Sequence, residues 1–585
     1  MRMDESGGPS SNSVAAPASA ERPRGRTRHP TLLAVRIYQQ CEFLSEGLIY
    51  GAVIFSPWAF GTTQPWAIWT MNGAGYLLGA LLLVKWWIRV RFCYSPPRWG
   101  VKSPELRVER EGKSEGRMTK PERSPKGQNP KSAGGPFPIR PFGFGVCFGF
   151  RPSGFGFSLG ILTGLLLVFC LISAQNARST YEPDQFGFRY HDYISWLPHS
   201  LDSRSSWAAF WNYLALGCAF WALRDWLGGK TFAEQRGERR ERESLNGQSL
   251  NRDSVHLLPG RLRRLLWVMC INGALLAVEG IAQRLSGSNR LLWVMPTRTN
   301  AAAELQFGPY AYRANAAQYF NLLWPVCLGF WWTIWRKEIR SPNDEGQKKS
   351  EIRMRKPERL VRRDSSFIHP SSFVLLCVAL IAVCPLISNS RGGVIIGLGQ
   401  LIMATLLFLF GLGSQHGLTK LALCFVVGAV LVTGGVLGWP KLSQRLQESG
   451  INVGDRERTY AVARPMAGDY PVFGTGPGTF NVLFQLYRPS IDEYWPAQLH
   501  NDWLETRITF GWAGSAMIAL ALSIVLARWF CPCGIQANWR FTGLVWLAIA
   551  GALAHARFDF PFQIYSILFL GLVLCAILSN LSRQS

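Results

Sequence analysis

The chain has 585 residues, 48% of them hydrophobic, and a formal net charge of +25. The hydrophobic residues gather in nearly uncharged blocks of about 18–22 residues, long enough to cross a hydrocarbon core as helices, which argues against a set of soluble domains. The Lys and Arg residues cluster in connections between some of these blocks. Such clusters indicate cytoplasmic loops of a membrane protein and argue against a nucleic-acid site.

Taken in chain order, the blocks predict an all-α polytopic membrane protein with about 12 transmembrane helices. We expect a disordered cytoplasmic N-terminus over 1–36, the first two spans within 37–88, and a basic low-complexity cytoplasmic insertion over 89–155. The next seven spans lie within 156–438, with basic cytoplasmic loops at 224–263 and 336–370. A large periplasmic loop follows at 439–510, and 511–585 holds the last three spans and a short C-terminus. The predicted spans are 37–57, 66–88, 156–175, 207–223, 264–283, 317–335, 371–388, 394–411, 420–438, 511–528, 542–556 and 562–579.

When the basic loops are placed in the cytoplasm, the segments that carry the candidate catalytic and binding residues all lie on the outer face of the membrane. A transporter would place such polar groups near the middle of the membrane. The 13 cysteines are scattered without the spacing of a disulfide framework or a zinc site. No metal site is predicted.

The outer loop at 439–510 ends in a candidate catalytic group. His500 stands at the entry to a predicted helix, with Asn501 and Asp502 directly after it. An imidazole titrates near neutral pH and can take a proton from a hydroxyl nucleophile. Upstream, the glycine run at 474–478 lacks the Lys-Ser/Thr of a nucleotide loop and predicts a tight turn instead.

Two other outer segments carry arginines. Arg391 follows Ser390 at the SRGG junction (390–393) between two spans, at the membrane–water boundary. Its guanidinium could bind the phosphate of a lipid-linked substrate, or it could simply snorkel to the headgroups of the membrane. Arg313 opens a span together with Asn315 and Gln318, whose amides could fix a sugar or a phosphate.

Taken together, these motifs resemble the O-antigen ligase/polymerase superfamily. The resemblance rests on SRGG, on Arg456 ahead of PVFGTGPGTF (471–480), and on LHNDWLE (499–505), and it covers about a third of the chain, roughly 300–520. One departure is Thr509, where the family usually has Glu, so that any role of that Glu moves to Glu505 or is dropped. We interpret HARFDFPF (555–562), which matches the family's last outer turn, as helix-turn packing.

The resemblance implies a GT-C-like fold and a metal-independent, inverting glycan transfer that needs no cofactor. His500 would act as the base and Arg391 as a catalytic cation. The implied substrate-binding residues are Arg313, Arg456, Asn315, Gln318, Asn501, Asp502 and Ser390. The implied partners are a glycan on a polyprenyl diphosphate, an acceptor glycolipid such as a lipopolysaccharide core or a glycan, and membrane lipids, but no nucleic acid. The implied location is the bacterial inner membrane.

Three activities share such a site: ligation of O-antigen to lipopolysaccharide, polymerisation of repeat units, and glycan transfer to protein. We favour the ligase as the commonest label for this motif set. A polysaccharide transporter is the main alternative from another class, because Glu42 and Glu46 lie on one face of a predicted span and could line a cavity. A scaffolding protein would not explain His and Arg residues gathered on one face.

Overall fold

A computed structural model describes most of the predicted membrane portion of the chain. The described residues are 31–99, 154–237, 258–297, 302–352, 369–409, 425, 427–436, 449–489, 497–530, 535–537 and 539–583. Most of the predicted N-terminal segment, most of the basic insertion and parts of the basic loops therefore lie outside the described residues.

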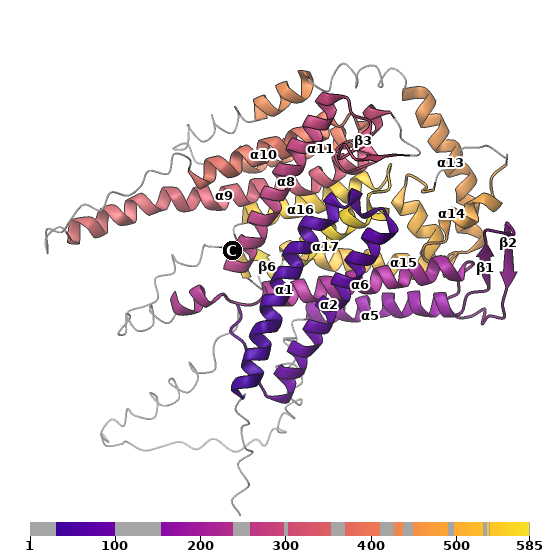
Figure 1. The fold of residues 1–585 in the computed structure, drawn as a ribbon, viewed down its shortest axis with the longest axis horizontal. Coiled ribbons are helices and arrows are strands. Elements are labelled where there is room, and N and C mark those ends of the chain that lie inside the picture. The colour runs from indigo at the N-terminus through magenta and orange to yellow at the C-terminus, as the bar shows by residue number, and fades with distance from the viewer. Residues whose placement is uncertain are drawn as a thin grey trace, which may run out of the picture.

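Long helices make up most of the described chain (Figure 1). They are α1 (Leu32–Trp58), α2 (Pro65–Arg91), α5 (Gly154–Gln175), α6 (Ser203–Leu227), α8 (Gly260–Ser286), α9 (Arg313–Ile352), α10 (Pro370–Ile387), α11 (Arg391–Leu409), α13 (Ser449–Asp469), α15 (Asp502–Ala527), α16 (Trp539–His555) and α17 (Tyr565–Asn580), with the single-turn α14 (Phe480–Leu483). The strands are short pairs: β1 (Ser179–Glu182) with β2 (Gly187–Tyr190), β3 (Arg290–Leu291) with β4 (Met295–Pro296), and β5 (Ile535–Ala537) with β6 (Leu581–Arg583).

This architecture confirms the predicted all-α polytopic fold. Six of the described helices are long and apolar enough to cross a bilayer, and every predicted span except 420–438 overlaps a described long helix. The span at 420–438 is described mainly at 427–436, which is helical. The total of about 12 spans stays a prediction.

The predicted outer loop at 439–510 differs from the structure in two respects. Its middle part holds the helix α13, and its end at 502–510 forms the first turns of α15. The hydrophobic block at 511–528 did not reveal this earlier start, because the first turns of α15 carry Asp502, Glu505 and Arg507. His500 and Asn501 therefore immediately precede a long helix.

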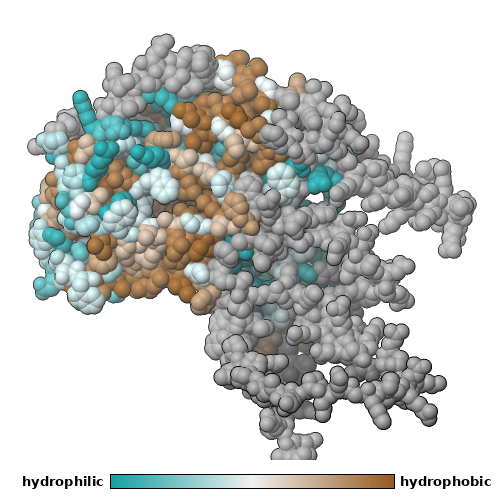
Figure 2. Space-filling model, turned by 180° about the vertical axis from the view of Figure 1, so that it is seen from behind, coloured by the Kyte–Doolittle hydropathy of each residue, from teal (hydrophilic) through white to brown (hydrophobic). Residues whose placement is uncertain are grey.

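Hydrophobic side chains cover much of the outward surface of the bundle. Figure 2 shows brown side chains over the middle of the visible described face and teal ones gathered toward one edge. Exposed side chains such as Leu83, Trp87, Leu275 and Ile402 lie on helices that are long and apolar enough to cross a bilayer. An apolar outer surface of this kind suits a bundle surrounded by lipid.

The two carboxylates that favoured transport are held in ion pairs. Glu42 lies 3.0 Å from the fully buried ammonium of Lys85 and also pairs with Arg261. Glu46 pairs with Arg264 at 2.9 Å. These contacts tie α1 to α2 and α8, so both carboxylates have structural partners and neither needs to line a transport cavity.

The glycine run ahead of His500 forms the predicted tight turn, which is packed against a kink in α15. Gly474, Gly476 and Gly478 all have positive φ angles. At the kink, Gly511 has φ 61° and ψ −165°, a region open almost only to glycine. The amides of Trp512 and Ala513 donate to the carbonyls of residues 471 and 472 at 2.9 and 3.0 Å.

Replacing Gly511 with Ala should destabilise the protein by about 2 kcal/mol or more, because of its backbone angles and because the new Cβ would lie 2.3 Å from the carbonyl oxygen of Val472. Thermal melting of the detergent-purified protein measures this loss. Gly51→Ala on α1 is the matched control, because a Cβ at this position meets nothing within 4 Å. We expect this substitution to be neutral or slightly stabilising. Equal melting of the two variants would contradict a structural role for the kink.

Candidate active site

The centre of the site is a histidine paired with a carboxylate from a distant segment. The Nδ1 atom of His500 lies 3.1 Å from Oδ1 of Asp559, which belongs to the turn between α16 and α17. An ionised carboxylate only accepts hydrogen bonds, so Nδ1 carries the proton and Nε2 keeps a free lone pair. The side chain of His500 is 28% exposed and that of Asp559 is 7% exposed. The imidazole can therefore meet a substrate while its partner stays buried.

Backbone and aromatic contacts fix the orientation of His500. Its φ angle is 56°, a left-handed conformation that non-glycine residues rarely adopt and that often marks functional sites. The hydroxyl of Tyr460 on α13 donates to the His500 carbonyl at 2.7 Å. The rings of Phe560 and Tyr312 meet the imidazole edge-on, with centroids 4.6 and 5.8 Å away.

The polar residues after His500 lock this arrangement together. Asn501 caps α15 by accepting a hydrogen bond from the amide of Leu504 at 3.1 Å. The amide of Asp502 donates to the carbonyl of Ala556 at 2.9 Å, and its carboxylate accepts from the amide of Phe562 at 2.8 Å. These bonds clamp the α16–α17 turn onto the start of α15, which brings Asp559 to His500.

An arginine and a tyrosine complete the group around Asp559. The guanidinium of Arg456 on α13 donates to the carbonyl of Phe558 at 2.6 Å. It also approaches the hydroxyl of Tyr312, which lies 3.5 Å from the other oxygen of Asp559. The structure thus brings Arg456 of α13 and His500, from the segment before α15, to the same turn.

This arrangement controls the charges of the group. Burial alone would raise the pKa of Asp559, but the hydrogen bond from His500 and the nearby His555 and Arg456 lower it below its ordinary value. Burial likewise would lower the pKa of Arg456, yet Tyr312 and Asp559 raise it. At neutral pH Asp559 is therefore anionic and Arg456 cationic.

The SRGG junction packs tightly beside the same turn. A Cβ on Gly392 would lie 2.9 Å from Nε2 of His555, and one on Gly393 would lie 2.3 Å from Cβ of Ala317. Ser390 caps α11 by accepting from the amide of Gly393 at 3.2 Å. These contacts set Arg391 at the start of α11. Its partly exposed side chain makes no ion pair or hydrogen bond within the described part of the chain.

The predicted site residues therefore form two groups. Arg313, Arg391, Arg456 and His500 are partly exposed. Asn315, Gln318, Ser390, Asn501 and Asp502 are no more than 5% exposed. Within the first group, Arg313 turns toward the carbonyl of Glu304, to which it donates at 3.0 Å.

The buried group supports the site from behind. Gln318 on α9 shares a hydrogen bond with Nδ1 of His555, which lies close to Asp559. Thr509 bonds back to the carbonyl of Glu505 at 2.8 Å, while the Glu505 carboxylate accepts from the amide of Leu499 at 2.8 Å. Glu505 therefore anchors the segment before His500 instead of facing outward.

Sequence reasoning missed two members of the site. Asp559 lies in HARFDFPF, which we interpreted as packing, and the turn does pack, but it also presents this carboxylate to His500. Tyr312 directly precedes the predicted Arg313 and has its hydroxyl near both Arg456 and Asp559. The family's His- and Asp-containing last turn was the available signal for Asp559.

Replacing Asp559 with Asn should slow any reaction in which His500 acts as the base by about a hundredfold or more, because the amide no longer holds the imidazole in the tautomer with a free Nε2. The initial rate of that reaction with the purified variant measures the effect. Asp469→Asn is a matched control, because it removes an exposed carboxylate that accepts from Tyr487 at 2.6 Å. Equal rates for the two variants would leave Asp559 a packing residue.

The same carboxylate predicts a pH dependence of stability. Because the pKa of Asp559 is lowered in the folded protein, its stabilising contribution is complete above the ordinary carboxyl value of about 3.9 and is lost as the pH falls further. The difference in melting temperature between wild type and Asp559→Asn should therefore be smaller in strong acid than at about pH 5, and an equal difference at both would contradict the ionised state of Asp559.

The apolar helices and the polar site at one end of them define a multi-pass membrane protein. Within the described residues, no group of three or more His, Cys, Asp or Glu could hold a metal ion. Residues 376–519 match the family model described as O-antigen ligase.

This match confirms the predicted resemblance to the O-antigen ligase superfamily and supports an O-antigen ligase/polymerase-like transferase function in general. The matched segment contains Arg391, Arg456 and His500, whereas Asp559 lies beyond it. No curated protein and no solved structure matches the chain.

Proposed function

We propose that the chain transfers a glycan from a polyprenyl-diphosphate donor to a hydroxyl of an acceptor on the periplasmic face of the bacterial inner membrane. The observation that carries this proposal is the His500–Asp559 pair. Arg456 and the SRGG junction both contact the residues around Asp559, at Phe558 and His555. The family match over 376–519 supports the same class of reaction.

The chemistry follows from the charges of these groups. Nε2 of His500 accepts the proton of the acceptor hydroxyl, and the acceptor oxygen forms a bond to the anomeric carbon of the glycan. The bond from that carbon to the diphosphate oxygen breaks, and its electron pair leaves with the polyprenyl diphosphate. Attack from the face opposite the leaving group inverts the anomeric configuration.

The arginines stabilise the departing diphosphate. Negative charge develops on the leaving oxygen, and a guanidinium binds phosphate oxygens in a bidentate manner without losing its charge. Arg391 suits this role because its side chain is partly exposed and lacks a partner among the described residues. Arg456 is already oriented by the carbonyl of Phe558, and Arg313 would have to leave the carbonyl of Glu304 to join it.

A transfer assay with defined acceptors tests the function. Proteoliposomes with a labelled lipid-linked oligosaccharide would receive, in parallel, a lipopolysaccharide-core glycolipid, a second lipid-linked repeat unit or a protein acceptor. Ligase activity, which we favour, labels the glycolipid. Polymerase activity labels the second lipid-linked repeat unit, and protein glycosylation labels the protein acceptor. Labelling of none, with the donor left intact, would contradict the proposal.

A further inference from the structure

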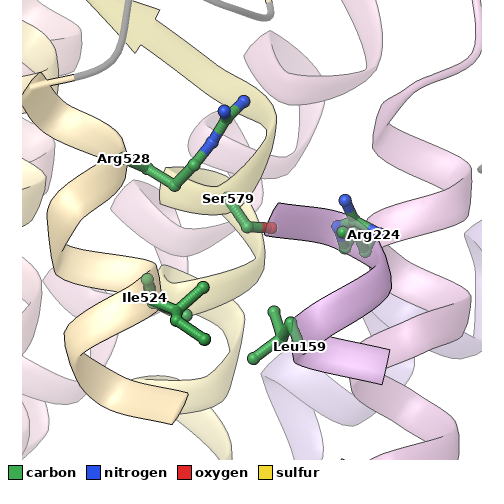
Figure 3. A pocket seen from close by; sticks show the side chains of 7 residues that line it. Leu159, Arg224, Ile524, Arg528 and Ser579 are labelled. Atoms are coloured by element: carbon green, nitrogen blue, oxygen red, sulfur yellow. The ribbon is translucent and has the colours of Figure 1, made fainter. Parts of the chain in front are cut away.

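A separate cavity lies at the ends of α15 and α17 that are away from the site (Figure 3). Its walls come from α5, α6, α17 and the end of α15 with the turn that follows it. The lining residues are Gly156, Leu159, Arg224, Ile524, Val525, Arg528 and Ser579. Two arginines and a hydroxyl thus share a hollow with three aliphatic side chains.

The guanidinium of Arg224 has no carboxylate of its own among the residues that the structure describes. Its side chain forms no ion pair with any residue that the structure describes, and its Nε atom is buried without a hydrogen-bond partner. The adjacent carboxylate, Asp225, is occupied by Lys85 at 3.0 Å and by Arg89 at 2.7 Å. Arg528 lines the same cavity, so a second guanidinium lies near that of Arg224. Two cations held together in this way are suited to an anion between them.

The glycine in the wall makes room for this arrangement. A Cβ on Gly156 would lie 3.0 Å from Nη2 of Arg224, so a larger residue would crowd the guanidinium. The Arg224 guanidinium is also held over the ring of Trp221, 5.0 Å from its centroid. The cavity therefore has an arginine whose orientation is set before any ligand arrives.

The position of the cavity indicates a lipid headgroup. In the predicted topology, the start of α5 and the ends of α6, α15 and α17 all face the cytoplasm. In Figure 3, Leu159 and Ile524 lie on one side of the arginines, along the direction of the helices. Cationic groups above an aliphatic floor at the end of membrane helices match the boundary between headgroups and acyl chains.

We propose that this cavity binds the headgroup of an anionic phospholipid of the cytoplasmic leaflet. Arg224 and Arg528 hold the phosphate, and the aliphatic residues contact the upper part of an acyl chain. The hydroxyl of Ser579 donates to the carbonyl of Ala576 at 2.9 Å, so its oxygen is left to accept a hydrogen bond from a headgroup hydroxyl. This favours phosphatidylglycerol, which carries such hydroxyls, over phosphatidylcholine, which has none.

Native mass spectrometry of the purified full chain, titrated with dioleoyl-phosphatidylglycerol, tests the proposal. The R224Q/R528Q double variant should bind this lipid about thirtyfold more weakly, because it loses both arginines that bind the phosphate. R528Q loses one of them and should bind about fivefold more weakly. The single variant keeps the test valid should the double variant fail to fold. R91Q, which removes an exposed arginine at the cytoplasmic end of α2, should bind as the wild type does.

Two competitors separate the possible sources of the anion. Neither dioleoyl-phosphatidylcholine nor inorganic phosphate should displace the bound phosphatidylglycerol. Displacement by inorganic phosphate would show a free-anion site and overturn the assignment to a lipid. The proposed site would be wrong if wild type and R528Q bound phosphatidylglycerol with equal affinity. It would also be wrong if R91Q lost as much affinity as R528Q.

Discussion

Replacing His500 with Ala should reduce glycan transfer by about a hundredfold to ten-thousandfold, the usual contribution of a general base. We expect this loss because, among the described residues, no other side chain in contact with Asp559 has an exposed ring nitrogen. His555, the other histidine near Asp559, is 1% exposed and shares its Nδ1 with Gln318. The initial rate of transfer in proteoliposomes measures the effect, with abundance and membrane insertion compared by immunoblot.

Two further variants separate catalysis from folding. His500→Gln keeps a donor for Asp559 but lacks a suitable base, so we expect it to be stable and as inactive as His500→Ala. His191→Ala is the matched control, because this exposed histidine of the predicted outer face bonds to Thr180 at 2.9 Å, away from the site. Transfer at the wild-type rate by His500→Ala would remove the assigned base.

Changing Arg391 to Lys should lower transfer by about tenfold to a hundredfold, and Arg391→Ala by more, because a point charge cannot bind two phosphate oxygens in parallel. The effect should fall on the maximal rate as well as on the apparent affinity for the donor, since the negative charge grows as the diphosphate leaves. Initial rates at varied donor concentrations measure both parameters.

The control for Arg391 is an arginine that differs mainly in location. Arg189 on β2 has a side chain that is 68% exposed and lies 3.6 Å from Glu182. Arg189→Lys should therefore leave transfer unchanged. If Arg391→Lys were equally active, Arg391 would be a residue that only snorkels to the headgroups.

The sequence predicted the helices well because lipid-facing spans leave a strong signal in composition. The blocks at 66–88 and 371–388 coincide closely with α2 and α10, where long apolar runs leave no other structure possible in a bilayer. The helix α13 was not predicted, because it lies in the outer loop and its sequence includes several charged residues, such as Arg456 and Glu457. Such a helix is held by tertiary packing, which composition does not show.

The site was predicted in part for a similar reason. Arg391, Arg456 and His500 could be named because they stand in motifs, but a motif does not say where a side chain points. Asn501 and Asp502 have polar side chains that suit a ligand, yet they are used for helix capping and for clamping the α16–α17 turn. Asp559 was passed over because its partner is 59 positions away, a separation that only the fold closes.

A structure of the protein with a bound polyprenyl diphosphate, determined by electron cryo-microscopy, would show directly whether His500 and the arginines surround the donor. We expect diphosphate density against the guanidinium groups of Arg391 and Arg456, with Nε2 of His500 facing the position of the sugar. Diphosphate bound at a different place on the chain, with His500 distant from it, would contradict the proposed mechanism.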